Sequence, residues 1–370
     1  MFVKILFISR ATLYKDKGGD TVQLVNTARF LKTLGVDVTI RLCNEKIDYS
    51  DYDLLHFFNI IRPADILTHV EKSGKPYVVS TIYVDYTEYE KKGRKGMAGL
   101  LFKTLSSDFI EYAKIMARFF TNGEKIISPG YVWLGQKKSV RKIIRAASML
   151  LPNSTSEYNR LVSHYKVENR YTVIPNAIDP GLFIMSSDRT KRMENLVICV
   201  GRIEGRKNQV NLIRALNNTK YHLVIIGSPS ANQVKYYERC RRLAAGNIQF
   251  IHSLRQEELV HYYGRAKVHV LPSWFETTGL SSLEAAVMGC NIVITDKGDT
   301  REYFENDAYY CDPASAMSIL EAVEKAANAG FSVHLRERIL TQYTWPRAAK
   351  KTYEAYREIL EDRRYQLIWI

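Results

Sequence analysis

The sequence predicts an α/β protein built from two doubly wound units with parallel sheets. Apolar runs of strand length alternate with amphipathic helical patterns along most of the 370 residues, and this alternation is typical of parallel sheets. It occurs in two series, separated near residues 176–190, so we expect two lobes with a cleft between them. A chain of 370 residues is long enough for two domains with full cores, and its apolar content of 46% is ordinary for a globular protein.

The predicted elements follow the chain in order. Residues 2–9 form the first predicted strand, and apolar residues at helical spacing predict a helix over 20–34. Further strands of the first series are expected near 36–42, 54–58 and 76–82. The second series gives strands near 196–200, 221–226, 247–251, 267–271 and 291–295. A last helix is expected at about 345–361.

The stretch from Ser273 to Glu284 is the most informative part of the sequence. The apolar run 268–271 predicts a short buried strand, and Gly279 precedes a predicted helix. A strand, a loop and a helix N-terminus form an anion site, because unpaired backbone N–H groups and the helix dipole point at the loop. Glu276 and Glu284 would then flank a phosphate, which suits a nucleotide sugar. The alternative is a solvated loop glutamate followed by a glutamate on a helix surface.

A pair of cations follows another predicted strand. Residues 197–201 predict a strand and a turn, and Arg202 and Lys207 follow before the next helical pattern. The carboxyl ends of parallel strands face the crevice in which α/β proteins bind ligands. The two cations are therefore placed to neutralise a diphosphate from two sides. Surface charge at the start of a helix is the alternative for either residue alone.

With these motifs, the chain resembles the retaining glycosyltransferases of family 4, which have the GT-B fold. The matching residues are Gly201-Arg202 with Lys207, the pair Glu276 and Glu284, Val-Ile-Pro-Asn-Ala-Ile-Asp at 173–179, residues 221–227, and Arg301-Glu302. The likeness covers most of the chain and is strongest from 171 to 312. Within the family, the chain is most similar to enzymes that build capsular, extracellular or O-antigen polysaccharides.

The resemblance implies two Rossmann-like domains whose parallel sheets face each other across a cleft. Residues 1–178 would form the acceptor domain, and residues 190–344 the nucleotide-sugar donor domain. A C-terminal helix, 345–370, would pack back on the first domain.

The resemblance also implies roles for the site residues. Arg202 and Lys207 would stabilise the leaving diphosphate, together with backbone N–H groups of Thr278, Gly279 and Leu280. Glu276 would hold hydroxyls of the sugar, and Glu284 the ribose diol.

The roles of two positions in the first predicted domain, Gly19 and Tyr83, remain open. Gly19 belongs to a paired glycine before a helix, where the backbone can approach a ligand closely. In the family this loop faces donor phosphates and acceptor; a turn capped by Asp20 or Thr21 is the alternative. Many family members have a histidine where this chain has Tyr83, with Asp85 nearby. Tyr83 would take the place of that histidine and hydrogen-bond the donor sugar. Tyrosine has a reference pKa of about 10, so it is a poor base near neutral pH.

Metal ions, cofactors and disulfides are not expected. Asp51-Tyr52-Asp53 resembles a metal-binding D-x-D motif, but it precedes the strand that contains His56, so we interpret it as a strand entry. His56 itself is interpreted as a strand histidine, and Tyr262-Tyr263 as helix packing. Five scattered cysteines and the lack of a signal peptide or membrane span favour a reducing, cytoplasmic location.

Positive charge is concentrated in one region. The chain carries a net charge of +14, and residues 89–148 hold many of its lysines and arginines, mixed with aromatic residues such as Trp133. This mixture favours peripheral contact with an anionic membrane or a lipid-diphosphate acceptor. A solvated helical face is the alternative. Nucleic acid is not expected, because no nucleic-acid-binding module is present.

The sequence as a whole predicts a metal-independent retaining glycosyltransferase without a cofactor. It would move a sugar from a nucleotide donor, most simply a UDP-sugar, to a glycan or lipid-linked acceptor in polysaccharide biosynthesis. Arg202, Lys207 and Glu276 are the expected catalytic residues. The alternative is a non-catalytic nucleotide-sugar-binding or assembly subunit of the same fold. The presence of Tyr83, where many family members have histidine, favours this alternative.

Overall fold

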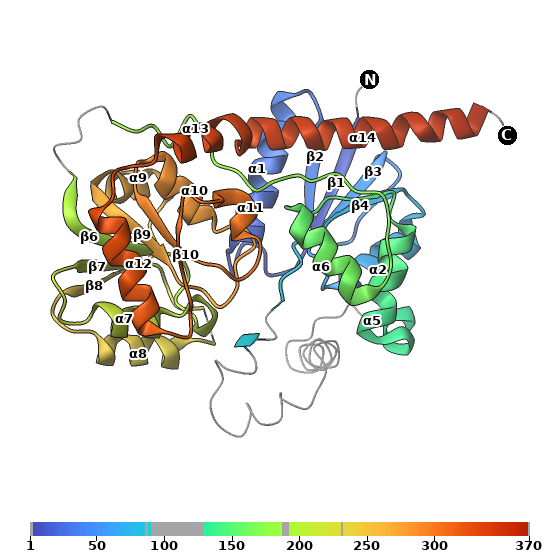
Figure 1. Cartoon of the computed structure of the whole chain (residues 1–370). Helices are drawn as coiled ribbons and strands as arrows, with labels where there is room; N and C mark the ends of the chain where they lie inside the picture. The colour runs from blue at the N-terminus through green and yellow to red at the C-terminus, as the bar shows by residue number, and fades with distance from the viewer. Residues whose placement is uncertain (1–2, 86–87, 90–128, 187–191, 231, 369–370) are drawn as a thin grey trace. The chain divides into compact units, whose positions relative to one another are not determined.

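Two α/β units make up the chain (Figure 1). The computed structural model describes residues 3–85, 88–89, 129–186, 192–230 and 232–368. The first unit comprises Met1–Tyr83, Gly96–Pro175 and Trp345–Ile370, and the second comprises Val84–Lys95 and Asn176–Thr344. The change between units at Asn176 lies close to the predicted boundary at residue 178. The short segment that joins the second unit after Tyr83 was not expected from the sequence.

The first unit contains a five-stranded parallel sheet in the order β2-β1-β3-β4-β5. Strands β3 and β4 are buried at every position, as expected for a parallel sheet covered on both faces. The strands are β1 (Lys4–Ser9), β2 (Asp37–Leu42), β3 (Leu54–Phe58), β4 (Tyr77–Ser80) and β5 (Met149–Leu150).

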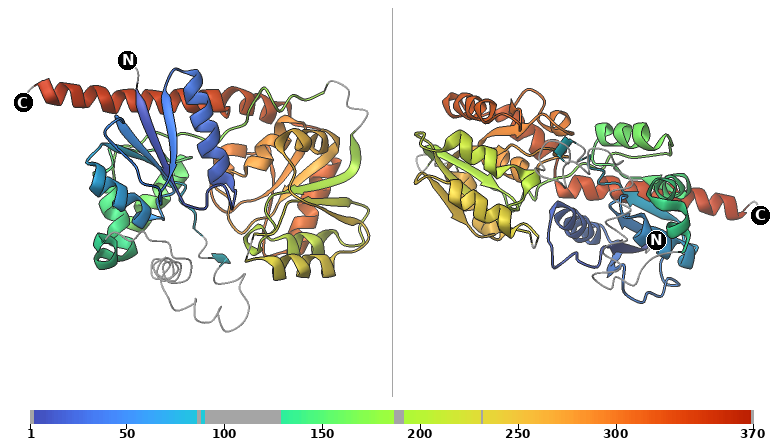
Figure 2. Two further views of the ribbon diagram at one scale, coloured as in Figure 1. Left: turned by 180° about the vertical axis from the view of Figure 1, so that it is seen from behind. Right: turned by 90° about the horizontal axis from the view of Figure 1, so that it is seen from below.

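Helices cover this first sheet. One core contains residues of α2 (Pro63–Ser73), α5 (Pro129–Ala146) and α6 (Thr155–Tyr165). Helices α1 (Gly19–Thr33) and α14 (Trp345–Ile368) lie side by side in the same unit (Figures 1 and 2). The last helix of the chain therefore belongs to the first unit.

His56 ties α14 to the first sheet. Its Nδ1 lies 2.6 Å from the hydroxyl of Tyr356 on α14, and its Nε2 lies 2.8 Å from Oγ of Ser80. Burial lowers the pKa of His56 to about 3, so the ring is neutral. It lies inside strand β3, as the sequence predicts. Asp53 accepts a hydrogen bond from the backbone N–H of Lys4 at 2.8 Å, which fits the strand entry predicted for residues 51–53.

The second unit contains a six-stranded parallel sheet in the order β11-β10-β9-β6-β7-β8. The chain runs outward from β6 to β8 and then returns to the other side of β6. The strands are β6 (Met193–Val200), β7 (His222–Ile226), β8 (Ile248–Ile251), β9 (Ala266–Leu271), β10 (Asn291–Thr295) and β11 (Tyr309–Cys311).

Alternate side chains of β6 enter two separate cores, as the pleat of a strand requires. Ile198 and Val200 pack with α9 (Gln256–Arg265), α10 (Leu280–Val287), α11 (Thr300–Phe304) and α13 (Val333–Gln342). Val197 and Cys199 pack with α7 (Gln209–Leu216), α8 (Val234–Leu243) and α12 (Ala316–Asn328). The sheet is thus a layer between helices, which fixes its strand ends.

Candidate nucleotide-sugar site

The topology of the second unit places two loops side by side. The chain leaves β6 toward β7 on one side and returns to β9 on the other, so strand order reverses between β6 and β9. Ligands of open α/β sheets bind beyond the carboxyl ends of strands at such a reversal. The loop with Arg202 and Lys207 follows β6, and the loop with Glu276 follows β9. The predicted site residues therefore lie in adjacent loops.

Close backbone contacts fix the loop after β6. The backbone N–H of Gly201 donates to the carbonyl of Ile226 at 3.0 Å, and a Cβ at Gly227 would lie 1.9 Å from the carbonyl oxygen of Gly201. Only glycine fits this approach at position 227. A 3₁₀ turn, Gly205–Lys207, follows, and Asn208 next to it has a positive φ of 61°.

Asn208 connects this turn to two other loops. Its side-chain amide donates to the carbonyl of Pro272 at 3.0 Å and to the carbonyl of Pro313 at 2.7 Å. Because Pro272 comes directly after β9, the loops that carry Lys207 and Glu276 are joined at their bases. The amide of Asn208 thus holds the two charged groups in a common frame.

Glu276 is a buried carboxylate paired with Lys207. The side chain of Glu276 is 8% exposed, and its Oε1 accepts from Nζ of Lys207. The backbone of Glu276 is tied to the loop after β10, because its N–H donates to the carbonyl of Lys297 at 3.1 Å and its carbonyl accepts from Asp299 at 2.9 Å. A Cβ at Gly298 would lie 2.0 Å from the carbonyl oxygen of Glu276. The position of this carboxylate is therefore set by backbone packing.

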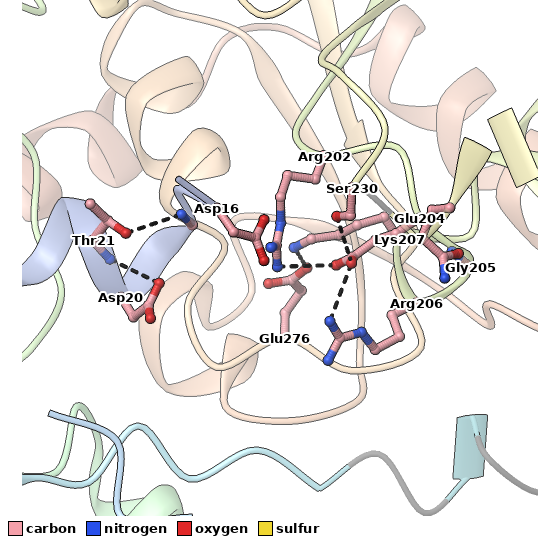
Figure 3. Close-up of polar contacts among 12 residues, drawn as sticks. Asp16, Asp20, Thr21, Arg202, Glu204, Gly205, Arg206, Lys207, Ser230 and Glu276 are labelled. Carbon is pink, nitrogen blue, oxygen red and sulfur yellow. Dashed lines mark hydrogen bonds and ion pairs between the residues drawn. The ribbon is translucent and has the colours of Figure 1, made fainter. Parts of the chain in front are cut away.

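A second buried carboxylate, Glu204, holds two arginines (Figure 3). Its Oε1 lies 3.4 Å from Nη2 of Arg202, and its Oε2 lies 3.2 Å from Nη2 of Arg206. Burial opposes ionisation of Glu204, but the charges of Arg206, Arg202 and Lys207 outweigh it and lower the pKa below its ordinary value. Sequence reasoning missed both Glu204 and Arg206. They lie between the two predicted cations, but nothing in their spacing shows that the side chains meet.

The N-terminus of α10 lies beside this pair of loops. Gly279, with φ of 75°, is its N-cap, and Thr278 and Leu280 flank it. The first N–H groups of a helix have no acceptor within the helix, so they are available to an anion. Oγ1 of Thr278 accepts from the side-chain amide of Asn176 at 3.1 Å, which orients the turn that leads into the helix.

Glu284 lies in the core beneath that helix end. Its Oε1 accepts from Nε2 of Gln256 at 2.7 Å, and its Oε2 accepts from the hydroxyl of Tyr263 at 3.0 Å. Burial raises the pKa of Glu284 to about 7, against an ordinary value of 4.5. Tyr263 is fully buried, as predicted for helix packing, but its hydroxyl also holds this carboxylate. Gln256 was not predicted.

Residues 183–341 match the family model described as Glycosyl transferases group 1. The matched residues all belong to the second unit. Arg202, Lys207, Glu276 and Glu284 lie within the matched residues, whereas the motif at 173–179 lies just before them.

Known proteins show the same likeness. D-inositol 3-phosphate glycosyltransferase of Acidothermus cellulolyticus is 25% identical over 249 residues, 60% of this chain and 56% of that relative. The chain thus spans little more than half the length of that relative. Sucrose-phosphate synthase from Thermosynechococcus elongatus superposes with a TM-score of 0.75 at 16% identity, covering 97% of this chain and 100% of that one. Anabaena Alr3699/HepE in complex with UDP and glucose gives 0.70 at 14% identity, covering 96% and 99%. The structural likenesses show the GT-B fold.

Gly19 belongs to the first unit, outside the residues that match the family model. It is the first residue of α1, after Gly18 at the N-cap. The preceding loop is folded around Arg10, whose Nε lies 2.7 Å from Asp20 and whose Nη2 donates to the carbonyl of Asp16 at 2.6 Å. Gly19 therefore begins a helix from an ordered loop. A contact between Gly19 and donor phosphates stays a prediction.

Tyr83 also lies in the first unit, at the position where the family often has histidine. Its backbone N–H donates to buried Glu157 at 2.8 Å, and its carbonyl accepts from Arg160 at 2.8 Å. The ring packs beside Tyr165 in the core, whereas Asp85 is exposed. A role for Tyr83 or Asp85 toward the sugar stays a prediction.

Among the described residues, no group of histidine, cysteine, aspartate and glutamate side chains has the arrangement of a metal site. All five cysteines are buried and free. Within the same ranges, every helix is too short or too polar to cross a membrane.

Proposed function

We propose that the protein is a retaining glycosyltransferase that uses a nucleotide-sugar donor, most simply a UDP-sugar. The observation that carries the proposal is the set of ionic pairs at the ends of β6 and β9. Arg202 is held by Glu204 and Lys207 by Glu276, beside the N-terminus of α10. Cations and helix N–H groups at one point form a site for a diphosphate. The binding of UDP and glucose by the Anabaena protein of the same fold supports the choice of donor.

Arg202 and Lys207 would act on the charge that develops when the donor breaks. The bond between the anomeric carbon and the diphosphate oxygen breaks, and the acceptor oxygen forms the new bond on the same face. A leaving phosphate oxygen takes the proton of the acceptor hydroxyl, so no separate protein base is required. Cations fixed at the diphosphate before reaction stabilise its growing charge without reorganisation. Backbone N–H groups at Thr278, Gly279 and Leu280 would share this role.

The two glutamates would bind different ends of the donor. Glu276 lies in a loop beside Lys207, so its free lone pairs can accept from sugar hydroxyls near the diphosphate. Glu284 lies within α10, and its carboxyl oxygens would accept from a ribose diol. Carboxylates with well-fixed backbones suit both tasks, because ionised groups make the stronger hydrogen bonds.

A binding and turnover screen tests this proposal. Calorimetry with UDP, other nucleoside diphosphates and their sugar conjugates should show that UDP binds in EDTA, since the proposed charges come from the protein. The best donor should then be consumed slowly by hydrolysis or by transfer to simple glycans. UDP binding that disappears in EDTA and returns with Mg2+ would contradict metal independence. Absence of binding for every nucleotide sugar would contradict the proposed function.

A non-catalytic nucleotide-sugar-binding subunit is the second candidate. The buried tyrosine at position 83, where related enzymes often have histidine, favours it. UDP binding without any donor consumption, across hexose and acetamido-hexose donors, would select this candidate. Donor consumption by the wild-type protein that is lost in Lys207→Ala would instead favour the catalytic candidate.

The acceptor would be a glycan or lipid-linked saccharide of polysaccharide biosynthesis, reached at an anionic membrane surface. Four cations on α5, Lys138, Arg141, Lys142 and Arg145, line a groove of about 490 Å³. Arg141 donates to the carbonyl of Tyr165 and Lys142 pairs with Glu71, whereas Lys138 and Arg145 are exposed on the helix. Trp133 nearby in the sequence is 89% exposed. Exposed cations with an exposed tryptophan suit the interface of an anionic bilayer. The lysines and arginines of the basic region that fall within 90–128 lie outside the described residues.

Vesicle sedimentation tests the membrane contact. The double variant Lys138→Ser and Arg145→Ser should bind phosphatidylglycerol vesicles less than wild type at low salt, because each cation contributes about 1 kcal/mol near an anionic surface. Lys235→Ser with Lys325→Ser removes the same charge from exposed positions of the second unit and is the matched control. Equal binding by the two double variants would contradict the contact.

A further inference from the structure

Glu204 is the buried carboxylate that both arginines of the donor loop share. Its side chain is 6% exposed, compared with 32% for Arg202 and 36% for Arg206. The carboxylate therefore lies beneath the two guanidinium groups, which are partly open to solvent. A buried carboxylate is costly unless it is paired, and the lowered pKa shows that the surrounding cations keep it ionised.

The backbone around Glu204 is fixed from three directions. Its carbonyl accepts from the N–H of Lys207 at 2.9 Å, closing the 3₁₀ turn. Ile203 before it pairs with the loop after β7, donating to the carbonyl of Ser228 at 3.0 Å. Gly205 after it donates to the side chain of Gln233 at 3.2 Å. A carboxylate on such a backbone has a defined position, so it can set the position of a more mobile side chain.

A fixed carboxylate partner helps to position Arg202, because immobilising an arginine side chain costs considerable rotamer entropy. Its backbone carbonyl is held by Nε2 of Gln209 at 2.9 Å, but the guanidinium extends from a partly exposed side chain. An ion pair made before the ligand arrives removes part of the entropic cost of binding. In the view of Figure 3, Arg202 and Arg206 approach Glu204 from two sides.

We propose that Glu204 is a positioning residue that holds the guanidinium of Arg202 for the donor diphosphate. It does not touch the donor. Its buried charge orients Arg202 and balances the cluster of Arg202, Arg206 and Lys207, in which Glu276 supplies the second negative charge. This inference rests on the proposed function, because it assigns a role at the same diphosphate site.

A double-mutant cycle between Glu204 and Arg202 tests the inference. Glu204→Gln should lower UDP affinity about tenfold, since a charged hydrogen bond contributes on that scale and the glutamine amide would oppose a guanidinium donor. In an Arg202→Ala background, the same change should lower affinity less than about twofold, because its effect passes through the missing arginine. Calorimetry with UDP and with inorganic pyrophosphate gives both measurements. Glu194→Gln, an exposed carboxylate paired with Lys267, is the control and should change neither.

Each outcome decides the role of Glu204. Equal losses in the two backgrounds would show a general structural effect and overturn the inference, and so would tighter binding by Glu204→Gln. If Glu204→Gln does not fold, Glu204→Asp keeps the charge but withdraws the carboxylate, and it should show the same dependence on Arg202. Pyrophosphate binding without UDP binding would reject the proposed donor while the cycle still tests Glu204. Binding of neither probe by wild type would overturn both proposals.

Discussion

Replacing Glu284 by glutamine should stabilise the second unit by about 2 kcal/mol more at pH 8 than at pH 5.5. The carboxyl group is buried, and both of its oxygens accept hydrogen bonds, from Gln256 and Tyr263. A glutamine has the same shape and can keep both contacts if the amide of Gln256 turns over. It removes a group whose ionisation is costly in the core.

The magnitude follows from the pKa of Glu284, which burial raises from 4.5 to about 7. Between these values the folded chain holds a proton that the unfolded chain has released, so the free energy of unfolding falls as pH rises. The stabilising contribution is complete below pH 4.5 and lost as pH rises through 7. Because one pH unit corresponds to about 1.4 kcal/mol, wild type should lose about 2 kcal/mol from this group between pH 5.5 and pH 8. Glu284→Gln should not show this loss.

Urea unfolding of both proteins at the two pH values measures the difference. UDP should shift the transition of the second unit in wild type, because a ligand stabilises the unit that binds it. Glu194→Gln removes an exposed carboxylate and should follow wild type at both pH values. A stability difference between wild type and Glu284→Gln that is the same at pH 5.5 and pH 8 would refute the reasoning.

Three further results are expected. Lys207→Ala should lower kcat at least about tenfold with an intact fold, because a charged hydrogen bond to a diphosphate is worth about 1.5–3 kcal/mol; a near-normal rate would contradict its role. Glu276→Gln should lower transfer while calorimetry shows UDP affinity almost unchanged, and a parallel loss of affinity would place this carboxylate at the nucleotide instead. Gly227→Ala should destabilise the second unit by about 1–3 kcal/mol, since the new Cβ would overlap the carbonyl of Gly201. Gly246→Ala, whose Cβ meets nothing within 4 Å, is its control in thermal unfolding, and equal stability would refute the steric argument.

The strands that the sequence predicts well are those buried along their whole length. Residues 54–58 and 291–295 have the predicted bounds as β3 and β10, because continuous apolar runs of this length are typical of parallel sheets. The two-residue β5 and three-residue β11 were missed, since such short segments carry no periodicity. Gly135 interrupts α5 at a non-helical φ and ψ. One glycine in a helical pattern does not reveal this break.

The spacing of residues along the sequence predicts which loops carry the site residues, but not which side chains pair with each other. Arg202, Lys207 and Glu276 follow predicted strands, so parallel topology alone brings their loops together. The pairs between Glu204 and the arginines depend on side-chain conformation within a tight turn. The hydroxyl contact of Tyr263 with Glu284 depends on how α9 packs against α10. Neither the ion pairs of Glu204 nor the contact between Tyr263 and Glu284 can be recognised from residue spacing.

The return of the chain to the first unit through α14 affects the order in which the protein can fold during synthesis. Tyr356 and Ile359 are buried in that helix, and Tyr356 supplies the partner of His56 on β3. A ribosome that has released only residues 1–175 has produced the first sheet without the helix that covers His56. Domains generally fold as units during synthesis, N-terminal ones first. Here the first unit gains the contact of Tyr356 with His56 only after α14 has emerged, whereas the sheet of the second unit is complete in the nascent chain before α14 emerges.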